Sequence, residues 1–323
     1  MKLELLVFVL CFSFQFLVSR ALECSSSKVA YTITVSQSGD ANFTTVTDAL
    51  KFIPSGNNQW IKILLKPGTY KEKIEIQQDK GCIVLEGEDR TTTKITYDAH
   101  SNTLESVTFA VSMDNFVAKG VTFENSYNII QKDTVPGVVP AVAYKSYGDK
   151  HAFYSCGFVG FQDTIWDDKG RHYFKSCYIE GAADFIWGNG QSVYEECEIN
   201  VTGEGFITAH GRESAGDTSG YVFRGCSVSG TGRVELGRAY RSFARVIFID
   251  SKFDNVINPE GWSIWHQEGH ENDITFAEVN CKGPGADTSN RVPWEKKLDA
   301  SEVEQYTTQA FVDQDGWIAK QPL

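Results

Sequence analysis

The 323-residue sequence predicts an all-β fold, a parallel β-helix that forms a single domain and carries short capping helices at its ends. Three observations support this prediction. A unit of about 20–25 residues repeats through the middle of the chain. Each unit consists of short runs of β-branched and aromatic residues broken by Gly, Asp and Asn, which are strand and turn signals. The same region shows no helical periodicity.

Cysteine marks the repeat. Each of four units carries an aromatic residue, a Cys two or three positions later, and a hydrophobic residue two positions beyond the Cys. These cysteines are Cys156, Cys177, Cys197 and Cys226, at intervals of 21, 20 and 29 residues. Equivalent positions in stacked coils lie about 4.8 Å apart, so we expect an inward-facing column of small, buried thiols. A disulfide between Cys197 and Cys226 is the alternative for that pair. A leucine-rich repeat has a similar period, but its pattern is absent.

The two open ends of a strand stack must be covered. A helix over the N-terminal end is predicted by one apolar helical face that stops at Pro54 and consists of Val46, Ala49, Leu50 and Ile53. Near the C-terminus, Ser301 and Glu304 have the spacing of a capping box, which predicts a second short helix. No linker or change in composition divides the chain.

The N-terminus reads as a secretory signal peptide, which we assign to residues 1–21. Lys2 precedes an apolar run of about 14 residues, and a small-x-small cleavage site follows. A transmembrane anchor is the alternative, but the run is short for the roughly 20 residues that span a bilayer. We therefore expect an exported protein whose single domain covers residues 22–323.

The charge of the chain limits its partners. The net charge of −12 includes Lys2, Glu4 and Arg20, which sum to +1, so about −13 remains without the signal peptide. Phosphate binding requires a basic face, so we expect no nucleic-acid partner, and we expect no membrane partner either. Asn42 and Asn200 each begin an N-x-T sequon and are candidate glycosylation sites.

Two carboxylates interrupt apolar stretches, Asp163 in GFQDTIWDD and Asp184 in GAADFIWGN. Asp163 lies seven residues after Cys156, and Asp184 lies seven after Cys177, so both occupy the same position on consecutive coils. Stacking should bring them within about 5 Å, where they cannot both ionise freely. A nucleophilic carboxylate beside a protonated one suits hydrolysis. The alternative is an Asp that only shapes a turn. This role accounts for either Asp alone better than for two Asp at the same position of consecutive coils.

Neighbouring residues favour ester hydrolysis. Carboxyls about 5 Å apart also fit a retaining glycosidase. Gln162, however, offers an amide donor to a developing oxyanion, which glycoside cleavage does not form. Arg238 lies between two small residues and would keep an anionic nucleophile ionised and oriented. Trp262 and Trp265 offer aromatic faces on which sugars pack.

These motifs together resemble those of the pectin methylesterases, or pectinesterases, along nearly the whole mature chain. GTYKEK at 68–73 is similar to the family's G-x-Y-x-E motif. GFQDTI, DFIWGN and LGRAY resemble its G-x-Q-D-T-L, D-F-I-F-G and L-G-R-P-W motifs in the same order. NPEGWSIW and the GPGA at 283–286 resemble its C-terminal blocks. The chain resembles the plant-type form that lacks the N-terminal inhibitor-like pro-domain.

The resemblance implies a right-handed parallel β-helix that hydrolyses methyl esters of polygalacturonate and releases methanol without a metal or cofactor. It makes Asp184 the nucleophile and Asp163 the general acid and then base. Gln162 would stabilise the oxyanion, and Arg238 would hold Asp184. The residues implied to line the sugar cleft are Trp262, Tyr240 and Trp187.

The resemblance also sets partners and location. It implies pectin as the substrate partner, a proteinaceous pectinesterase inhibitor as a second candidate partner, and a monomer secreted to the cell wall.

Two departures from the family pattern affect the expected activity. The family usually places a Gln, a second oxyanion donor, where the stretch PAVAYKS has Pro140. Tyr240 replaces the Trp of L-G-R-P-W but keeps an aromatic face. A catalytically weakened or inactive pectin-binding β-helix is therefore the alternative function. A β-helix polysaccharide hydrolase or lyase is a third, which chain shortening of polygalacturonate would reveal.

Overall fold

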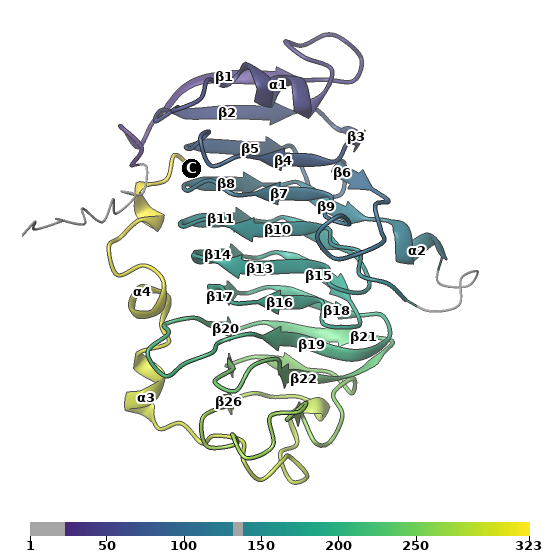
Figure 1. Ribbon diagram of the computed structural model, residues 1–323, viewed down its shortest axis with the longest axis vertical. Helices are drawn as coiled ribbons and strands as arrows, with labels where there is room; N and C mark the ends of the chain where they lie inside the picture. Colours follow the sequence, from purple (N-terminus) through teal and green to yellow (C-terminus); the bar gives the residue numbers. More distant parts are fainter. Residues whose placement is uncertain (1–22, 132–137) are drawn as a thin grey trace, which may run out of the picture.

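The computed structural model describes residues 23–131 and 138–323, which form a stack of coils (Figure 1). The expected signal peptide, residues 1–21, lies outside the described residues. Strands of neighbouring coils pair in parallel, so the parallel β-helix predicted from the repeat is confirmed. Within the described residues, no helix is long and apolar enough to span a bilayer.

Three sheets form the walls of the β-helix. Each coil from β2 to β25 contributes one strand to each sheet, and the outermost strands β1 and β26 belong to sheet 1 alone. Sheet 1 has ten strands: β1 (Val29–Val35), β2 (Trp60–Leu65), β5 (Ile83–Gly87), β8 (Phe116–Lys119), β11 (His151–Tyr154), β14 (Arg171–Lys175), β17 (Gln191–Glu195), β20 (Gly220–Arg224), β23 (Arg245–Ile249) and β26 (Thr275–Val279). Sheet 2 has eight strands: β4 (Ile74–Ile76), β7 (Phe109–Val111), β10 (Tyr144–Tyr147), β13 (Ile165–Lys169), β16 (Ile186–Gly188), β19 (Glu204–His210), β22 (Arg233–Ala239) and β25 (Trp262–Ser263). Sheet 3 has eight strands: β3 (Gly68–Lys71), β6 (Thr93–Tyr97), β9 (Thr122–Asn125), β12 (Gly157–Val159), β15 (Tyr178–Gly181), β18 (Glu198–Val201), β21 (Ser227–Gly230) and β24 (Lys252–Phe253).

The repeat forms two internal columns. The buried cysteines follow a residue with positive φ in each coil, such as Ser155 before Cys156 and Ser176 before Cys177. Each thiol donates to the carbonyl two residues earlier, at 3.5–3.7 Å. The aromatic residues of the repeat stack face to face with centroids 4.3–4.6 Å apart, in the order Phe153, Phe174, Tyr194, Phe223 and Phe248. The predicted column of buried free thiols is confirmed for the cysteines of the repeat, including Cys197 and Cys226.

Helix α1 (Val46–Phe52) covers the N-terminal end of the stack, as predicted. Its buried face includes Val46, Ala49 and Leu50. The carboxylate of Glu72 accepts from the N–H groups of Val46 and Thr47 at 2.8 Å, which satisfies donors that a helix start leaves unpaired. Glu72 belongs to the GTYKEK motif, so this motif fixes the cap rather than the chemistry.

The C-terminal segment, yellow in Figure 1, runs along the outside of sheet 1. It carries α3 (Ala300–Glu304), α4 (Thr308–Phe311) and the short helix η2 (Ile318–Lys320); α2 (Tyr127–Gln131) and η1 (Pro284–Ala286) lie elsewhere in the chain. A capping box begins α3, but its members are Asp299 and Glu302, so the expected pair Ser301 and Glu304 was wrong by two residues. Tyr306, Phe311 and Trp317 pack on the outward side chains of sheet 1.

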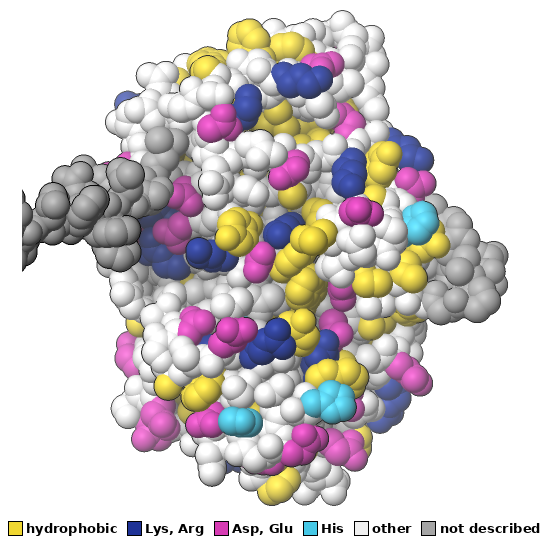
Figure 2. Space-filling model, viewed as in Figure 1, with side chains coloured by type: hydrophobic (Ala, Val, Ile, Leu, Met, Phe, Trp, Pro, Cys, Tyr) yellow, Lys and Arg dark blue, Asp and Glu magenta, His cyan; other side chains and the backbone are white. Residues whose placement is uncertain are grey.

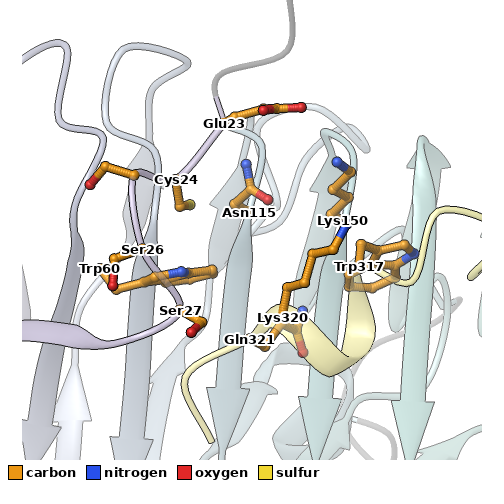
Figure 3. A pocket seen from close by; sticks show the side chains of 11 residues that line it. Glu23, Cys24, Ser26, Ser27, Trp60, Asn115, Lys150, Trp317, Lys320 and Gln321 are labelled. Atoms are coloured by element: carbon orange, nitrogen blue, oxygen red, sulfur yellow. The ribbon is translucent and has the colours of Figure 1, made fainter.

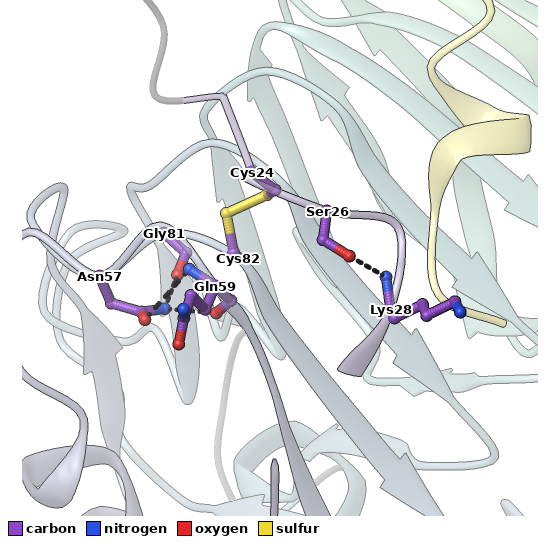
Figure 4. Close-up of a disulfide and its surroundings, with 7 residues drawn as sticks. All are labelled: Cys24, Ser26, Lys28, Asn57, Gln59, Gly81 and Cys82. Carbon is purple, nitrogen blue, oxygen red and sulfur yellow. Dashed lines mark hydrogen bonds between the residues drawn. A yellow bond between two sulfur atoms is a disulfide. The ribbon is translucent and has the colours of Figure 1, made fainter. Parts of the chain in front are cut away.

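A disulfide joins Cys24 to Cys82 (Figure 4), and the alternative pairing of Cys197 with Cys226 is not formed. The bond between Cys24 and Cys82 fixes the N-terminal arm, the described residues that precede β1, over Trp60 and Val84 on the outside of sheet 1. Where this arm meets the C-terminal segment, a pocket of about 240 Å³ remains, with Cys24 and Trp60 on one side and Lys320 on the other (Figure 3). The outer face of sheet 1 is thus covered at both ends.

We expect that replacing both cysteines of the disulfide by serine lowers the free energy of unfolding by about 4 kcal/mol. The bond joins residues with a sequence separation of 58 and so closes a long loop. Cross-linking this loop reduces the conformational entropy of the unfolded chain. Urea unfolding of the variant and of a Cys281→Ser control, which changes a free thiol, measures the effect. Equal destabilisation of the two would contradict the prediction.

A polar network crosses the core between sheets 1 and 2. The Asp167 carboxylate contacts His172 and accepts from the Tyr194 hydroxyl at 2.6 Å, and all three are fully buried. Burial opposes the charge of both groups, yet their mutual attraction lowers the pKa of Asp167 and raises that of His172. His151, stacked 5.1 Å above His172, has its pKa lowered to about 3 and is neutral. The network ties two sheets together without reaching solvent.

Candidate active site

The two aspartates occupy equivalent corners where the chain passes from sheet 3 to sheet 2. Asp163 lies between β12 and β13, and Asp184 lies between β15 and β16. Both have positive φ, 62° and 50°, a conformation that Asp tolerates better than most residues. The corner conformation repeats on consecutive coils, so it presents both carboxylates on the same side of the stack.

Backbone pairing stacks the two corners directly. Gln162 pairs with Ala183, and the N–H of Asp163 donates to the carbonyl of Ala183 at 3.0 Å. Burial, and then the nearby charge of Asp184, raise the pKa of Asp163 to about 7, although Arg238 opposes the shift. Asp163 is therefore a protonated acid at mildly acidic pH.

Arg238 holds the carboxylate of Asp184 from two strands away. Register pairs Trp187 with Ala209 and Ala209 with Arg238, and the small side chain of Ala209 leaves room for the arginine to reach across β19. Its Nε and Nη2 donate to the two oxygens of Asp184 at 2.7 and 2.9 Å. This bidentate pair fixes the orientation of the carboxylate and supports its negative charge.

Aromatic rings surround the guanidinium of Arg238. Its central carbon lies 4.6 Å from the ring centre of Trp265, 5.1 Å from that of Tyr240 and 5.9 Å from that of Phe206. Its Nη1 is buried and has no hydrogen-bond partner within the described part of the chain. Contacts between the guanidinium and these rings therefore take the place of a hydrogen bond to Nη1.

Gln162, the expected oxyanion donor, directly precedes Asp163 at this corner. Gln162 is half-buried, and its amide makes no hydrogen bond to another described residue. Pro140 directly precedes Ala141, whose N–H donates to the carbonyl of Gln162 at 3.3 Å. The position at which the family pattern has a second donor therefore adjoins Gln162, and the proline offers no donor there.

The outer face of sheet 2 carries a row of side chains aligned by strand register. Lys145, Trp166, Trp187, Ala209 and Arg238 pair in that order on β10, β13, β16, β19 and β22. The rings of Trp166 and Trp187 stack with centroids 4.5 Å apart. On the face seen in Figure 2, hydrophobic side chains gather in a band with basic and acidic groups beside it. Such a surface suits a sugar chain that carries carboxyl groups.

Two predicted sugar contacts, Tyr240 and Trp187, lie at this face, but Trp262 does not. Trp262 is 2% exposed and stacks on Phe276 in the core, so neither face of its ring is available to a ligand. Trp265, three residues later, is 43% exposed and lies beside Arg238. Trp265 has positive φ, 42°, which turns the chain so that its ring faces outward.

Lys145 was missed in the sequence, although the repeat contained the signal. The interval of 21 residues that separates Trp166 from Trp187 also separates Lys145 from Trp166. Phe206 gave no comparable signal.

The sequon residues lie away from the carboxylates. Asn42 accepts from the N–H of Thr34 near the N-terminal cap, and Asn200 donates to Glu180 on the outside of sheet 3.

Comparison with known proteins shows the family to which the chain belongs. The family model described as Pectinesterase matches residues 32–315. Probable pectinesterase 55 of Arabidopsis thaliana is 45% identical over 302 residues, which cover 91% of this chain and 92% of that protein. A pectin methylesterase from carrot superposes with a TM-score of 0.84 at 28% identity and covers 91% of this chain and 97% of its own. A pectin methylesterase from Aspergillus niger, at 30% identity, gives 0.78 with coverages of 91% and 98%.

The fold is thus the right-handed parallel β-helix of these structures, and the protein is a carboxylic ester hydrolase. The chain belongs to the pectinesterase family.

Proposed function

We propose that this protein hydrolyses methyl esters of partly esterified polygalacturonate, with Asp184 as nucleophile and Asp163 as general acid and then base. The observation that carries the proposal is the stacked pair of unequal carboxyl groups. Both oxygens of Asp184 accept from the fork of Arg238, whereas Asp163 has no such partner and a pKa raised to about 7 by burial and the charge of Asp184. When two neighbouring acids lie in environments as different as these, one is suited to nucleophilic attack and the other to proton transfer.

In the first step, an oxygen of Asp184 attacks the ester carbonyl carbon. The carbonyl oxygen becomes an oxyanion that accepts a hydrogen bond from the Gln162 amide. As the C–O bond to the methoxy group breaks, Asp163 gives its proton to the departing oxygen and methanol leaves. An anhydride then joins Asp184 to the galacturonyl carbonyl.

In the second step, Asp163 is ionised and takes a proton from a water molecule that attacks the same carbonyl. The bond to Asp184 breaks, which restores the Asp184 carboxylate and the protonated Asp163 and leaves a galacturonic acid unit that then loses its proton to water. The use of one residue as acid and then base follows from microscopic reversibility, and a pKa near 7 suits both roles close to neutral pH.

The exposed aromatic side chains beside the carboxylates give the polymer a surface. Trp187, Tyr240 and Trp265 offer ring faces or edges to the sugar units, and pectin is the proposed partner. We place the protein outside the cell, in the cell wall, as a monomer whose activity a proteinaceous inhibitor could block. Attached glycans at Asn42 and Asn200 would accompany export.

Methanol release from esterified pectin tests the proposal. The purified protein should release methanol above the background of an Asp184→Ala variant, and the polymer should keep its length. No release above that background would leave only the pectin-binding alternative. Shortening of unesterified polygalacturonate would instead favour a hydrolase or lyase.

Pro140 supports weakened catalysis as a second candidate function, because one expected oxyanion donor is missing beside Gln162. We expect Pro140→Gln to raise kcat for methanol release by about tenfold to 100-fold, since one such donor is worth on the order of 10²–10³ in rate. Pro140→Ala is the matched control, because it restores the backbone N–H without the amide. An equal gain in both variants would assign the effect to the backbone, and no gain in either would show that the donor does not limit the rate.

A further inference from the structure

Strand β1 ends sheet 1 at the N-terminal end of the stack, and β2 is its one strand partner among the described residues (Figure 1). We call the other, unpaired side of β1 its free edge. The outermost strands of the three sheets other than β1 are short, with two to five residues: β3, β4, β24, β25 and β26. β1 has seven residues and no charged side chain or proline, and its ladder with β2 runs regularly from Tyr31 to Val35. Short length, lysine and proline are the usual protections of an outermost strand, so β1 lacks them.

The chain that follows β1 covers only part of this free edge. Phe43 pairs with Val35: the N–H of Phe43 donates to the carbonyl of Thr34 at 3.2 Å, and the N–H of Ser36 donates to the carbonyl of Phe43 at 2.9 Å. Successive residues of a strand direct their backbone groups to opposite edges, so the N–H and carbonyl of Thr32 face the free edge like those of Thr34. No strand of the described chain pairs with Thr32 on that side.

The side chain of Asn42 lies against the free edge. Its Oδ1 accepts from the N–H of Thr34 at 2.9 Å, where the carbonyl of a neighbouring strand would otherwise stand. Asn42 begins a sequon that Thr44 completes, and both side chains are exposed. Glycosylation transfers an oligosaccharide from a lipid diphosphate donor: C1 of the first sugar replaces one hydrogen of the amide nitrogen, and the proton leaves with the diphosphate. The step leaves Oδ1 unchanged, so Asn42 can carry a glycan and keep its bond to Thr34.

Exposed aromatic rings lie beside the free edge. Tyr31 in β1 is 39% exposed, and Phe52 at the end of α1 is 61% exposed. The ring centres of Phe52 and Phe43 are 5.7 Å apart, so Phe52 adjoins the residue that covers part of the edge. Figure 2 shows hydrophobic side chains at this end of the molecule. Unpaired backbone groups beside such rings favour a second copy as partner, because pairing would satisfy the backbone and bury the rings.

We propose that a glycan on Asn42 covers the free edge of β1 and keeps the protein monomeric, and that the partner it excludes is the same edge of a second copy. A two-fold axis between two copies would set their β1 strands antiparallel and join the two ten-stranded sheets. A bulky, hydrated glycan on Asn42 occupies the space that the second strand needs. The inference rests on the glycosylation included in the proposed function, and it does not depend on ester hydrolysis.

Sedimentation velocity over a range of protein concentrations tests the role of this glycan, with protein secreted by a eukaryotic host that attaches mannose-rich glycans. Thr44→Ala removes the sequon but keeps Asn42 and its bond to Thr34. We expect this variant to raise the self-association constant at least about tenfold over that of the wild type, because the free edge is then open to a second copy. Thr202→Ala removes the sequon of Asn200 on sheet 3, so it is the matched control and should stay monomeric.

Two further proteins locate the surface and separate the glycan from the substitution. Thr32 is exposed in β1, and Thr32→Lys added to Thr44→Ala should restore the monomer, because it places a positive charge in both pairing strands. Treating the folded Thr202→Ala protein with an endoglycosidase trims the Asn42 glycan to one sugar without changing the β1 edge. The trimmed protein should associate as Thr44→Ala does.

Three results would each overturn the inference. They are a trimmed protein that stays monomeric, an association of Thr44→Ala that Thr32→Lys does not reverse, and a secreted wild type that mass spectrometry shows to carry no glycan on Asn42. Methanol release from the same samples keeps failure of the proposed function distinct. A wild type that releases none would contradict ester hydrolysis, while sedimentation would still decide whether the glycan covers the edge.

Discussion

Asp184→Asn should lower kcat for methanol release by at least about 10⁴-fold, because it removes the nucleophile and leaves only binding and the oxyanion donor. The change keeps the shape of the side chain and one oxygen for Arg238, so the fold should survive. The loss should appear in kcat rather than in KM, since an attacking atom acts only after the substrate is bound. Methanol release under saturating pectin measures it.

Asp315→Asn is the matched control for this experiment. Asp315 accepts from both terminal nitrogens of Arg171 at 2.7 and 3.3 Å, so it has the same kind of arginine fork on the outside of sheet 1. Its loss should leave kcat unchanged. Activity of Asp184→Asn within tenfold of the wild type would reject Asp184 as the nucleophile, and Asp163 would then be the first residue to test in that role.

The parts of the fold that repeat could be predicted from the sequence. A β-helix places equivalent residues of successive coils in register, so the equal intervals between Cys156 and Cys177 and between Asp163 and Asp184 carry three-dimensional information. The stacked aspartates followed from that interval alone. The link from Arg238 to Asp184 is different, because it crosses two strands and depends on a small residue between them. The small neighbours of Arg238 indicated an arginine beside an anionic nucleophile, and the resemblance to a family named Asp184 as its partner.

The parts that occur once could not be predicted in the same way. The partner of Cys24 depends on where a terminal arm lies, and nothing in the repeat specifies that path. Trp262 and Trp265 share one motif, yet a backbone turn places one ring in the core and the other at the cleft. The Asp167 and His172 pair is buried between sheets, where alternation along a strand predicts apolar residues. Single features need tertiary context that periodicity does not contain.

Asp163→Asn should stabilise the protein at pH 8 by about 4 kcal/mol while it abolishes proton transfer. The pKa of Asp163 rises from its ordinary value of 3.8 to about 7 on folding, so the folded protein binds the extra proton between those values. The stability of the wild type therefore falls as the pH rises from about 4 to 7, at roughly 1.4 kcal/mol for each unit. Asparagine is neutral at every pH, so the variant does not lose this stability as the pH rises. Urea unfolding at pH 4 and pH 8 measures the difference, which should nearly disappear at pH 4.

Asp315→Asn again supplies the control, because it should change stability in the opposite direction. Burial opposes its charge, yet the hydrogen bond and charge of Arg171, with the charge of Lys150, together lower the pKa of Asp315 to about 2. That ion pair stabilises the protein above the ordinary pKa of Asp and is lost as the pH falls toward 2. The wild type should thus exceed Asp315→Asn in stability at pH 8 but fall below Asp163→Asn. If Asp163→Asn were no more stable than the wild type at pH 8, Asp163 would be ionised at neutral pH, and the first proton would have to come from another donor.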